Sequence, residues 1–143
     1  MKKHFKTCLI ALFALLMGVS VTSEAWAART EISVQTSAKW RDGLTTNEDR
    51  LTLTAADVSN KNQCDFAPGI VMIIQNSGAS PYTYTITSKA DQLGRVGDLT
   101  QTLAAGDIRL IQLDTVEGFM QDDGKLYFEG SNAAIKFSPI RLR

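Results

Sequence analysis

Hydrophobic residues of this chain fall in short runs that are bounded by turn-forming residues. Residues 70–75 are five apolar residues followed by Gln, which is typical of a strand buried on both faces. From Tyr82 onward, Tyr82, Tyr84 and Ile86 alternate with threonines, so they share one face of a second strand. The pattern predicts two adjacent β-strands, the first of them central in the fold. The turn between them should reverse the chain, because Gly78 is able to adopt a positive φ and Pro81 cannot donate to a ladder.

The region before this pair has a weaker pattern. Residues 30–36 alternate Ile32 and Val34 with polar residues, which predicts a strand. Residues 51–54 predict another short strand. The mostly polar residues 55–68 predict a long connection that lies over the core.

Further along the chain, two pairs of strand-like runs each flank a short turn. Residues 99–103 and 108–113 are separated by a loop with Gly106 where a positive φ is wanted, which predicts a hairpin. Residues 125–129 and 133–137 predict a second hairpin. Several short strands with regular turn signals and no long helix predict an all-β fold, a single antiparallel β-sandwich with jelly-roll-like connectivity.

The first 27 residues have the three parts of a secretory signal peptide. They combine a charged start, an apolar stretch too short to span a bilayer comfortably, and small residues Ala25 and Ala27 before the cut. Cleavage after Ala27 leaves one β-sandwich domain over residues 28–143, with no membrane span. The expected location is therefore secreted, periplasmic or at the cell surface.

Composition narrows the functional classes. The chain has 15 basic and 15 acidic residues, and residues 28–143 keep 12 and 14 of them, a net charge of about −2. This charge balance gives no excess of positive charge that would attract the phosphates of nucleic acid. The single histidine, His4, lies in the signal, so the mature chain has no imidazole for acid–base work, nucleophile activation or zinc. We therefore expect a protein that is not an enzyme and holds no cofactor.

Cys64 is the one cysteine after the signal peptide, because Cys8 lies within it. Free cysteines are among the most buried residues, so a buried, inert thiol is one interpretation. An oxidising compartment also allows a disulfide between subunits, which makes Cys64 an assembly candidate.

Acidic and aromatic residues supply two further candidate sites. Calcium takes oxygen ligands, so four clustered acids are calcium candidates, although their spacing is not that of an EF-hand and a solvated turn is the default. These acids are Asp114, Glu117, Asp122 and Asp123. Two carboxylates could also hydrolyse a glycosidic bond, but nothing in the sequence pairs two of them in a cleft.

A candidate binding surface for a sugar or a partner consists of Trp40, Tyr82 and Tyr84, with Tyr127 as a further aromatic. Aromatic residues in strands more often cover a core. Because Tyr82 and Tyr84 share a strand face, both point inward or both point outward.

The order of several motifs resembles a known family. The motifs are IVMIIQN from residue 70, GAS from 78, TYTI from 83, GD from 97, AG from 105, Phe119 with DG from 123, LYF from 126 and IRL from 140. Over about the last 75 residues this series resembles small β-sandwich structural proteins of tailed bacteriophage virions, here in an exported form. The resemblance implies a scaffold for symmetric assembly and no enzymatic role.

The features predict an exported, non-enzymatic structural protein that self-assembles as a homo-oligomer, in a surface or extracellular fibre or array. The alternatives are a secreted module that binds carbohydrate or another cell-surface partner, and a prophage-derived virion structural protein. Assembly is expected to involve Ile32 and Val34. These side chains either complete the sheet of their own chain or fill pockets of a neighbouring subunit, where repeated pairing would build a filament.

Overall fold

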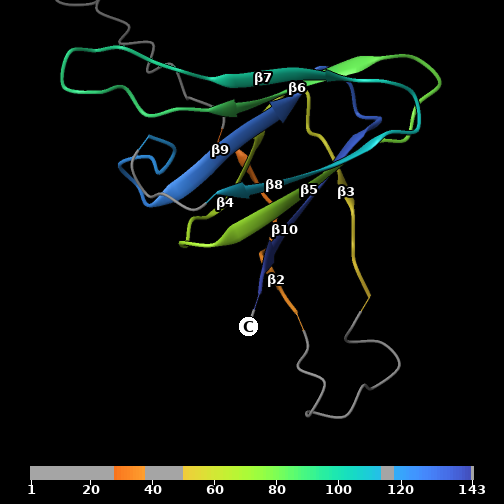
Figure 1. The fold of residues 1–143 in the computed structure, drawn as a ribbon, viewed down its shortest axis with the longest axis horizontal. Coiled ribbons are helices and arrows are strands. Elements are labelled where there is room, and N and C mark those ends of the chain that lie inside the picture. Colours follow the sequence, from red (N-terminus) through yellow and green to blue (C-terminus); the bar gives the residue numbers. More distant parts are fainter. Residues whose placement is uncertain (1–27, 38–49, 114–117, 143) are drawn as a thin grey trace, which may run out of the picture.

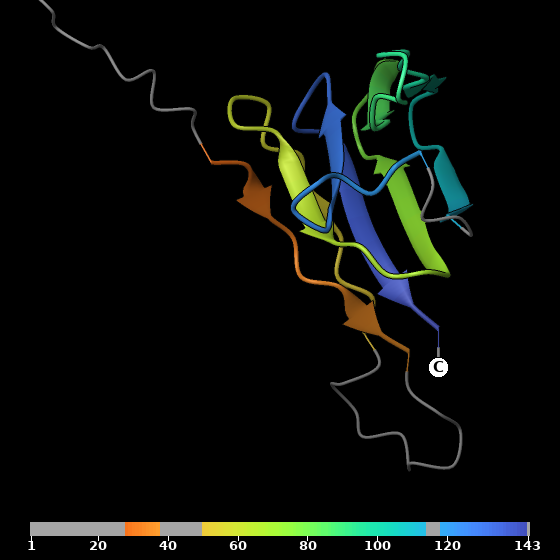
Figure 2. The ribbon, with the colours of Figure 1, turned by 90° about the vertical axis from the view of Figure 1, so that its left-hand side faces the viewer.

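The computed structural model describes residues 28–37, 50–113 and 118–142 (Figure 1). This part of the chain contains ten β-strands and no helix. The strands form two sheets that pack against each other, as two layers in Figure 1 and side by side in Figure 2. The expected all-β sandwich is confirmed.

The strands divide evenly between the two sheets. They are β1 (Thr30–Glu31), β2 (Gln35–Thr36), β3 (Thr54–Ala55), β4 (Asn62–Asp65), β5 (Ile70–Asn76), β6 (Tyr82–Thr87), β7 (Leu99–Leu103), β8 (Ile108–Leu113), β9 (Lys125–Gly130) and β10 (Ile135–Arg141). Sheet A has the order β1-β4-β9-β6-β7. Sheet B has the order β2-β10-β5-β8, with β3 also paired to β10.

Strands β3 to β10 pair in a nested order. β6 pairs with β7, β5 with β8, β4 with β9 and β3 with β10, and all four pairs are antiparallel. The chain therefore forms one long antiparallel ladder that is rolled into the orders β4-β9-β6-β7 and β3-β10-β5-β8. Two four-stranded sheets connected in this way are a jelly roll, so the predicted jelly-roll-like connectivity is confirmed.

β1 and β2 add to this jelly roll in parallel. Glu31 of β1 lies beside Gln63 of β4, and Gln35 of β2 lies beside Ile140 of β10. Both sheets are therefore mixed, whereas the sequence predicted purely antiparallel pairing. The single strand expected over residues 30–36 is in fact two short strands, one in each sheet, joined by residues that pass between the layers.

Both predicted hairpins are wrong in their pairing. β7 and β8 lie in different sheets, and so do β9 and β10, because the short loops between them cross from one layer to the other. Gly106 in the first loop has the expected positive φ of 80°. β5 and β6 are also in different sheets. β5 is apolar on both faces, and both of its edges are paired, one with β10 and the other with β8. No edge of β5 is therefore left for β6, the strand that follows it in the sequence.

The stretch of residues 55–68 was predicted to be a connection, yet it contains β4. The inward side chains of β4 are Asn62 and Cys64, both fully buried. A buried amide at one of two inward positions hides the apolar alternation that normally indicates a strand. The strand predicted at residues 51–54 is observed only at its last residue and the one that follows, as β3 (Thr54–Ala55).

The core lies between the two sheets and receives side chains from both. Its buried members are Ile32, Ala56, Cys64, Met72, Ile74, Tyr84, Ile86, Leu103, Leu113, Leu126, Phe128, Ile135 and Phe137. The rings of Phe128 and Phe137 meet edge to face with centroids 4.7 Å apart, which joins β9 of one sheet to β10 of the other. Strand β5 is central in sheet B, as the sequence predicted.

Gly78 is required in its turn for space. Its φ is not positive, so the turn does not use the conformational freedom that the sequence offered there. A Cβ at this position would lie 2.7 Å from Cε2 of Tyr82 and 3.0 Å from Cβ of Ala134. The absence of a side chain lets the turn approach the Tyr82 ring closely.

Candidate functional site

Residues 28–37, called the N-terminal segment below, run along one side of the sandwich and cover an edge of each sheet, as the orange strands of Figure 2 show. In sheet A, the N–H of Thr30 donates to the carbonyl of Lys61 at 3.0 Å, and that of Ile32 to Gln63 at 2.8 Å. In sheet B, the N–H of Ser37 donates to the carbonyl of Arg141 at 3.0 Å. One short segment thus supplies main-chain partners to both sheets.

Side chains anchor the N-terminal segment between the layers. Ile32 is 4% exposed and belongs to the core, and Val34 is partly buried and packs against it. The Gln35 side chain donates from Nε2 to Oγ of Ser138 at 2.6 Å and accepts from the N–H of Thr52 at 2.9 Å. Within this chain, Ile32 and Val34 complete the sandwich as one of the two predicted arrangements requires.

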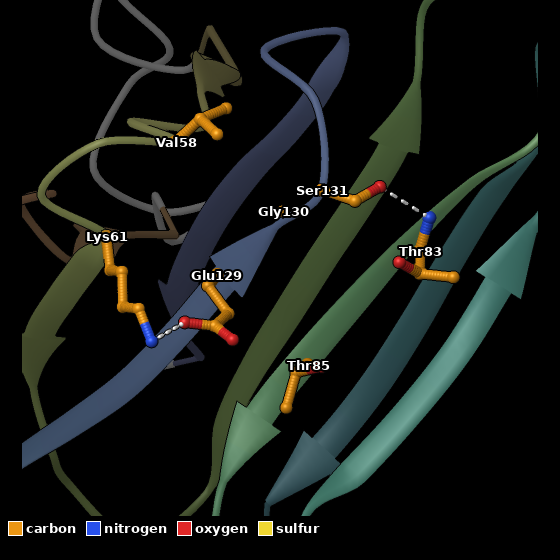
Figure 3. A pocket seen from close by; sticks show the side chains of 7 residues that line it. All are labelled: Val58, Lys61, Thr83, Thr85, Glu129, Gly130 and Ser131. Atoms are coloured by element: carbon orange, nitrogen blue, oxygen red, sulfur yellow. Dashed lines mark hydrogen bonds and ion pairs between the residues drawn. The ribbon is translucent and has the colours of Figure 1, made fainter.

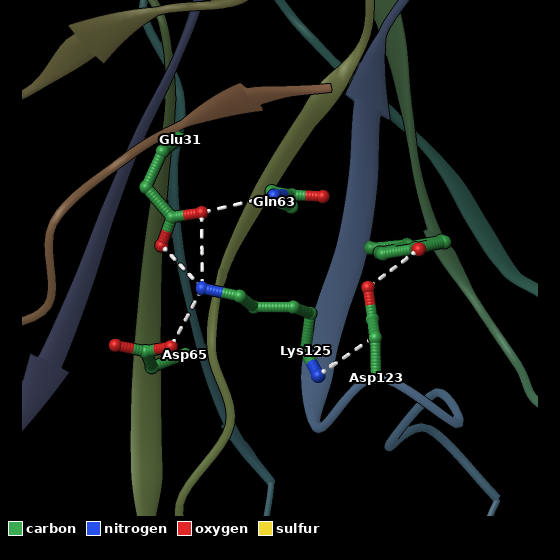
Figure 4. A network of polar contacts seen from close by, with 6 residues as sticks. Glu31, Gln63, Asp65, Asp123 and Lys125 are labelled. Atoms are coloured by element: carbon green, nitrogen blue, oxygen red, sulfur yellow. Dashed lines mark hydrogen bonds and ion pairs between the residues drawn. The ribbon is translucent and has the colours of Figure 1, made fainter. Parts of the chain in front are cut away.

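Lys125 ties the segment to sheet A on the outside. Its ammonium lies between Asp65, at 2.7 Å, and the two carboxylate oxygens of Glu31, at 3.2 and 3.3 Å (Figure 4). Glu31 also accepts from Nε2 of Gln63 at 3.0 Å. The hydrogen bond to Asp65, followed by that to Glu31, raises the pKa of Lys125, so the ammonium stays charged.

The opposite edges carry no N-terminal segment. β7 and β8 stand at the ends of their sheets, and each pairs with one strand among the residues that the structure describes. Two apolar side chains of β8 are exposed, Ile108 at 59% and Leu110 at 66%.

A polar hollow lies on the outer face of sheet A, over β9, β6 and the residues that precede β4 (Figure 3). Its volume is about 180 Å³. It is lined by Val58, Lys61, Thr83, Thr85, Glu129, Gly130 and Ser131. Nζ of Lys61 pairs with Oε2 of Glu129 at 2.6 Å, and Oγ of Ser131 accepts from the N–H of Thr83 at 3.0 Å. The hollow therefore presents hydroxyl groups around an ion pair.

A larger groove of about 510 Å³ shares Lys61 with this hollow and extends toward β1. Its lining is Ala28, Arg29, Ser59, Asn60, Lys61, Gln63 and Tyr127. The guanidinium of Arg29 stacks 4.2 Å from the centre of the Tyr127 ring. The Tyr127 hydroxyl donates to Asp123 at 2.8 Å, and this bond raises the pKa of Tyr127.

Sequence reasoning missed most of this groove. Tyr127 was considered among the aromatics, and its place between the buried Leu126 and Phe128 is a signal that it points outward. Arg29 and Lys61 follow no pattern that would single them out. They meet only because β1 lies parallel to β4.

Tyr82 and Tyr84 do not form an outward platform. Tyr84 is 1% exposed, and its hydroxyl contacts Oε1 of Gln101 at 3.1 Å. Tyr82 is partly buried and packs against the core. The outward alternative is wrong because the strand face that both rings share with Ile86 is the face turned to the core, where Ile86 is fully buried. Trp40 lies outside the described residues.

Of the calcium candidates, Asp114 and Glu117 lie outside the described residues. Asp122 pairs with Nζ of Lys89 at 2.6 Å. Asp123 accepts from the N–H of Lys125 at 3.0 Å and from Tyr127, so both of its oxygens are engaged. In the described ranges, no group of three or more His, Cys, Asp or Glu residues is placed to hold a metal ion.

Cys64 is fully buried in sheet A, and its thiol has no exposed surface. Burial, with a smaller contribution from Glu31 and Asp65, raises the pKa of Cys64 to about 12. The thiolate is the nucleophile in disulfide formation. The folded domain therefore matches the buried, inert thiol and does not present Cys64 for a disulfide between subunits.

Comparisons with known proteins identify no relative: no family model, curated protein or solved structure matches the chain. The resemblance to virion proteins therefore stays a prediction. The structure contains, within the described ranges, no helix with the length and apolar character needed to cross a membrane.

Proposed function

We propose that the protein is an exported, non-enzymatic structural subunit that self-assembles by exchange of its N-terminal segment. The observation that carries the proposal is that residues 28–37 close the edges of both sheets in parallel, outside the eight-stranded jelly roll. A subunit that lacked the segment would leave unpaired the outer edge of β4 and the part of β10 that lies beyond its pairing with β3, and open edges favour association.

The contacts of the segment suit a strand supplied by a neighbour. Main-chain hydrogen bonds to Lys61, Gln63 and Arg141 are independent of side-chain identity, and Ile32 fills a place in the core that fixes the register. The same contacts form whether the segment belongs to the same chain or to the next one. If each subunit donates to the next, the contact is heterologous and repeats along a filament.

Disulfide trapping distinguishes the two arrangements. Glu31 and Gln63 are directly paired in register between β1 and β4, and adjacent strands bring Cα atoms within the reach of a disulfide. We mix one chain that carries E31C with a second chain that carries Q63C and oxidise the mixture. Segment exchange predicts a disulfide-linked heterodimer on a non-reducing gel, because the two cysteines then come from different subunits.

The matched control uses two residues within one folded body. Thr83 and Thr102 are paired between β6 and β7, so a T83C chain mixed with a T102C chain should give no specific heterodimer. A double E31C and Q63C chain that closes its disulfide internally, while the mixed single variants remain monomers, would overturn the exchange.

Deletion of residues 28–37 gives an independent test. Exchange predicts a folded domain that no longer assembles and that binds a free peptide of the same ten residues, whereas the I32D peptide fails to bind. Light scattering of the mature chain should show oligomers. A strictly monomeric mature chain that unfolds when residues 28–37 are removed would show that the segment belongs to its own sheets.

The expected place of such a subunit is a surface or extracellular array, and the support for export is the signal-like start of the sequence. The jelly roll itself is compatible with the virion alternative, because viral capsid proteins use this fold.

A second candidate is a secreted module that binds carbohydrate or another cell-surface partner. It is favoured by the polar hollow and the adjoining groove, whose hydroxyl, amide and aromatic groups suit sugar hydroxyls. Jelly rolls also occur among lectins. Binding of glycans by a strictly monomeric chain would favour this function over assembly.

A further inference from the structure

We infer that the groove beside β1 is a binding site for an anionic glycan whose carboxylate groups pair with the N-terminal end of the mature chain. This inference deepens the proposed binding function and is independent of segment exchange. The groove has the same lining whichever subunit supplies Ala28 and Arg29. The inference rests on cleavage of the signal peptide after Ala27, which makes Ala28 the first residue of the mature chain.

The groove has cationic lining groups and no acidic ones. Arg29 and Lys61 are its charged lining residues. Cleavage after Ala27 adds the α-ammonium of Ala28, a third cation, because an α-amino group has a pKa of about 8 and is mostly protonated at neutral pH.

The carboxylates bonded to groove residues are already engaged. Glu129 pairs with Lys61, Glu31 accepts from Gln63 and pairs with Lys125, and Asp123 accepts from Tyr127. The hydroxyl of Thr30 donates to Asp57 at 2.6 Å. Asp57 also accepts from the N–H groups of Asn60 and Ser59, at 2.9 and 3.0 Å. The bonds from Asn60, then that from Thr30 and least that from Ser59, lower the pKa of Asp57 to about 2. Asp57 therefore holds the rim of the groove in place.

Arg29 is the cation that is left for a ligand. In the described part of the chain, no carboxylate lies within 4.0 Å of its guanidinium. Its contacts are the ring of Tyr127, at 4.2 Å, and the carbonyl of Asn62, which accepts from Nη1 at 3.3 Å. These contacts orient the guanidinium and leave other N–H groups for a carboxylate, which it can bind in a two-pronged fashion.

The remaining lining explains the choice of a sugar acid. Ser59, Asn60 and Gln63 are neutral donors and acceptors, of the kind that pair with sugar hydroxyls. Tyr127 adds an aromatic body whose hydroxyl is fixed by Asp123. A volume of about 510 Å³ is in the range of small-ligand sites. The combination fits a polysaccharide that contains uronic acids.

The experiment measures binding of oligogalacturonate by calorimetry to the exported chain, whose mass shows whether it begins at Ala28. The matched ligand is the same oligomer with its carboxylates methyl-esterified. We expect binding of the acid form, weakened at high salt, and at least tenfold weaker binding of the ester. R29Q should lose roughly tenfold to a hundredfold in affinity, as expected for a hydrogen-bonded charge.

Two further chains separate charge from folding. Acetylation of the Ala28 α-amino group removes the third cation without altering a side chain and should weaken binding severalfold. K89M removes a cation that pairs with Asp122 elsewhere and should leave affinity unchanged. The circular dichroism spectrum of R29Q should match that of the unmodified chain, which checks that the variant is folded.

Three results would overturn the inference. Equal binding of acid and ester would show a site for neutral sugar, which leaves the binding module in place but removes the anionic ligand. Full affinity in folded R29Q would place the site elsewhere. Failure of both the acid and the ester to bind would remove the inference, while the binding function toward other ligands and the disulfide-trapping result for assembly would stand.

Discussion

Asn76 joins two loops to the end of β5, and its replacement should be among the more damaging single changes in the domain. The residue is 0% exposed. Its Nδ2 donates to the carbonyls of Ser80 at 2.8 Å and of Leu103 and Ala104, both at 3.1 Å. Its Oδ1 accepts from the N–H of Gly78 at 2.9 Å. One amide therefore organises both the β5–β6 turn and the β7–β8 loop.

The magnitude follows from these contacts. Two amide protons serve three carbonyls, so N76A removes about two donated hydrogen bonds and one accepted bond, each worth about 1 kcal/mol net. The Leu103 contact is buried, whereas those to Ser80 and Ala104 are partly buried, so water can replace some of the loss. We expect N76A to lower the free energy of unfolding by about 3 kcal/mol.

The assay is urea unfolding of residues 28–143, followed by far-ultraviolet circular dichroism. N76D keeps the shape of the side chain but replaces the donating NH2 group, which faces three carbonyl oxygens, with a carboxylate oxygen. At neutral pH it should therefore lower the free energy of unfolding by at least as much as N76A. The control is S77A: its hydroxyl donates to the carbonyl of Ala134 at 2.9 Å in an exposed position, and the expected cost is within about 0.5 kcal/mol. A loss below about 1 kcal/mol for N76A would refute the reasoning.

Three further predictions concern space, protonation and charge. G130A should cost about 1–3 kcal/mol in urea unfolding, because its Cβ would lie 2.8 Å from Cβ of Ala56 and 2.9 Å from Cβ of Ile135, whereas G97A enters open space and serves as the control. Cys64 should resist thiol reagents until the chain unfolds. Since its pKa is raised to about 12 from 9.0, the unfolded chain releases the proton first, so stability should decrease between pH 9 and 12, and C64A should lack that part of the decrease. K125M leaves Glu31 and Asp65 without their shared cation, so its urea midpoint should fall in low salt and recover in about 0.5 M salt. Loss of stability that is independent of salt would contradict this account.

Several features of the fold were predictable because they depend on local composition. The apolar, β-branched run of β5 indicated a strand buried on both faces, and the alternation through Tyr82, Tyr84 and Ile86 indicated which side chains share a face. These properties follow from the two-residue repeat of a strand. The sequence also predicted the sandwich class and its jelly-roll-like connectivity, because many short strands separated by turns have few other ways to bury their apolar faces.

The candidate site was predictable only in part. The sequence singled out Ile32 and Val34, which anchor the N-terminal segment, and it considered Tyr127. It also singled out Tyr82 and Tyr84 as a candidate surface, although alternation alone could not say which of the two strand faces meets the core.

What the sequence by itself determined was which residues form strands and which faces need burial. The tertiary structure decided which strands lie side by side. A loop of four residues is compatible with a hairpin or with a crossing between layers. The nested pairing of β3 with β10 and of β4 with β9 is selected only when the apolar faces of all the strands are buried at once. The groove has the same origin. Arg29, Lys61 and Tyr127 are far apart in sequence. The antiparallel register of β4 on β9 brings Lys61 near Tyr127, and the parallel register of β1 on the other edge of β4 adds Arg29.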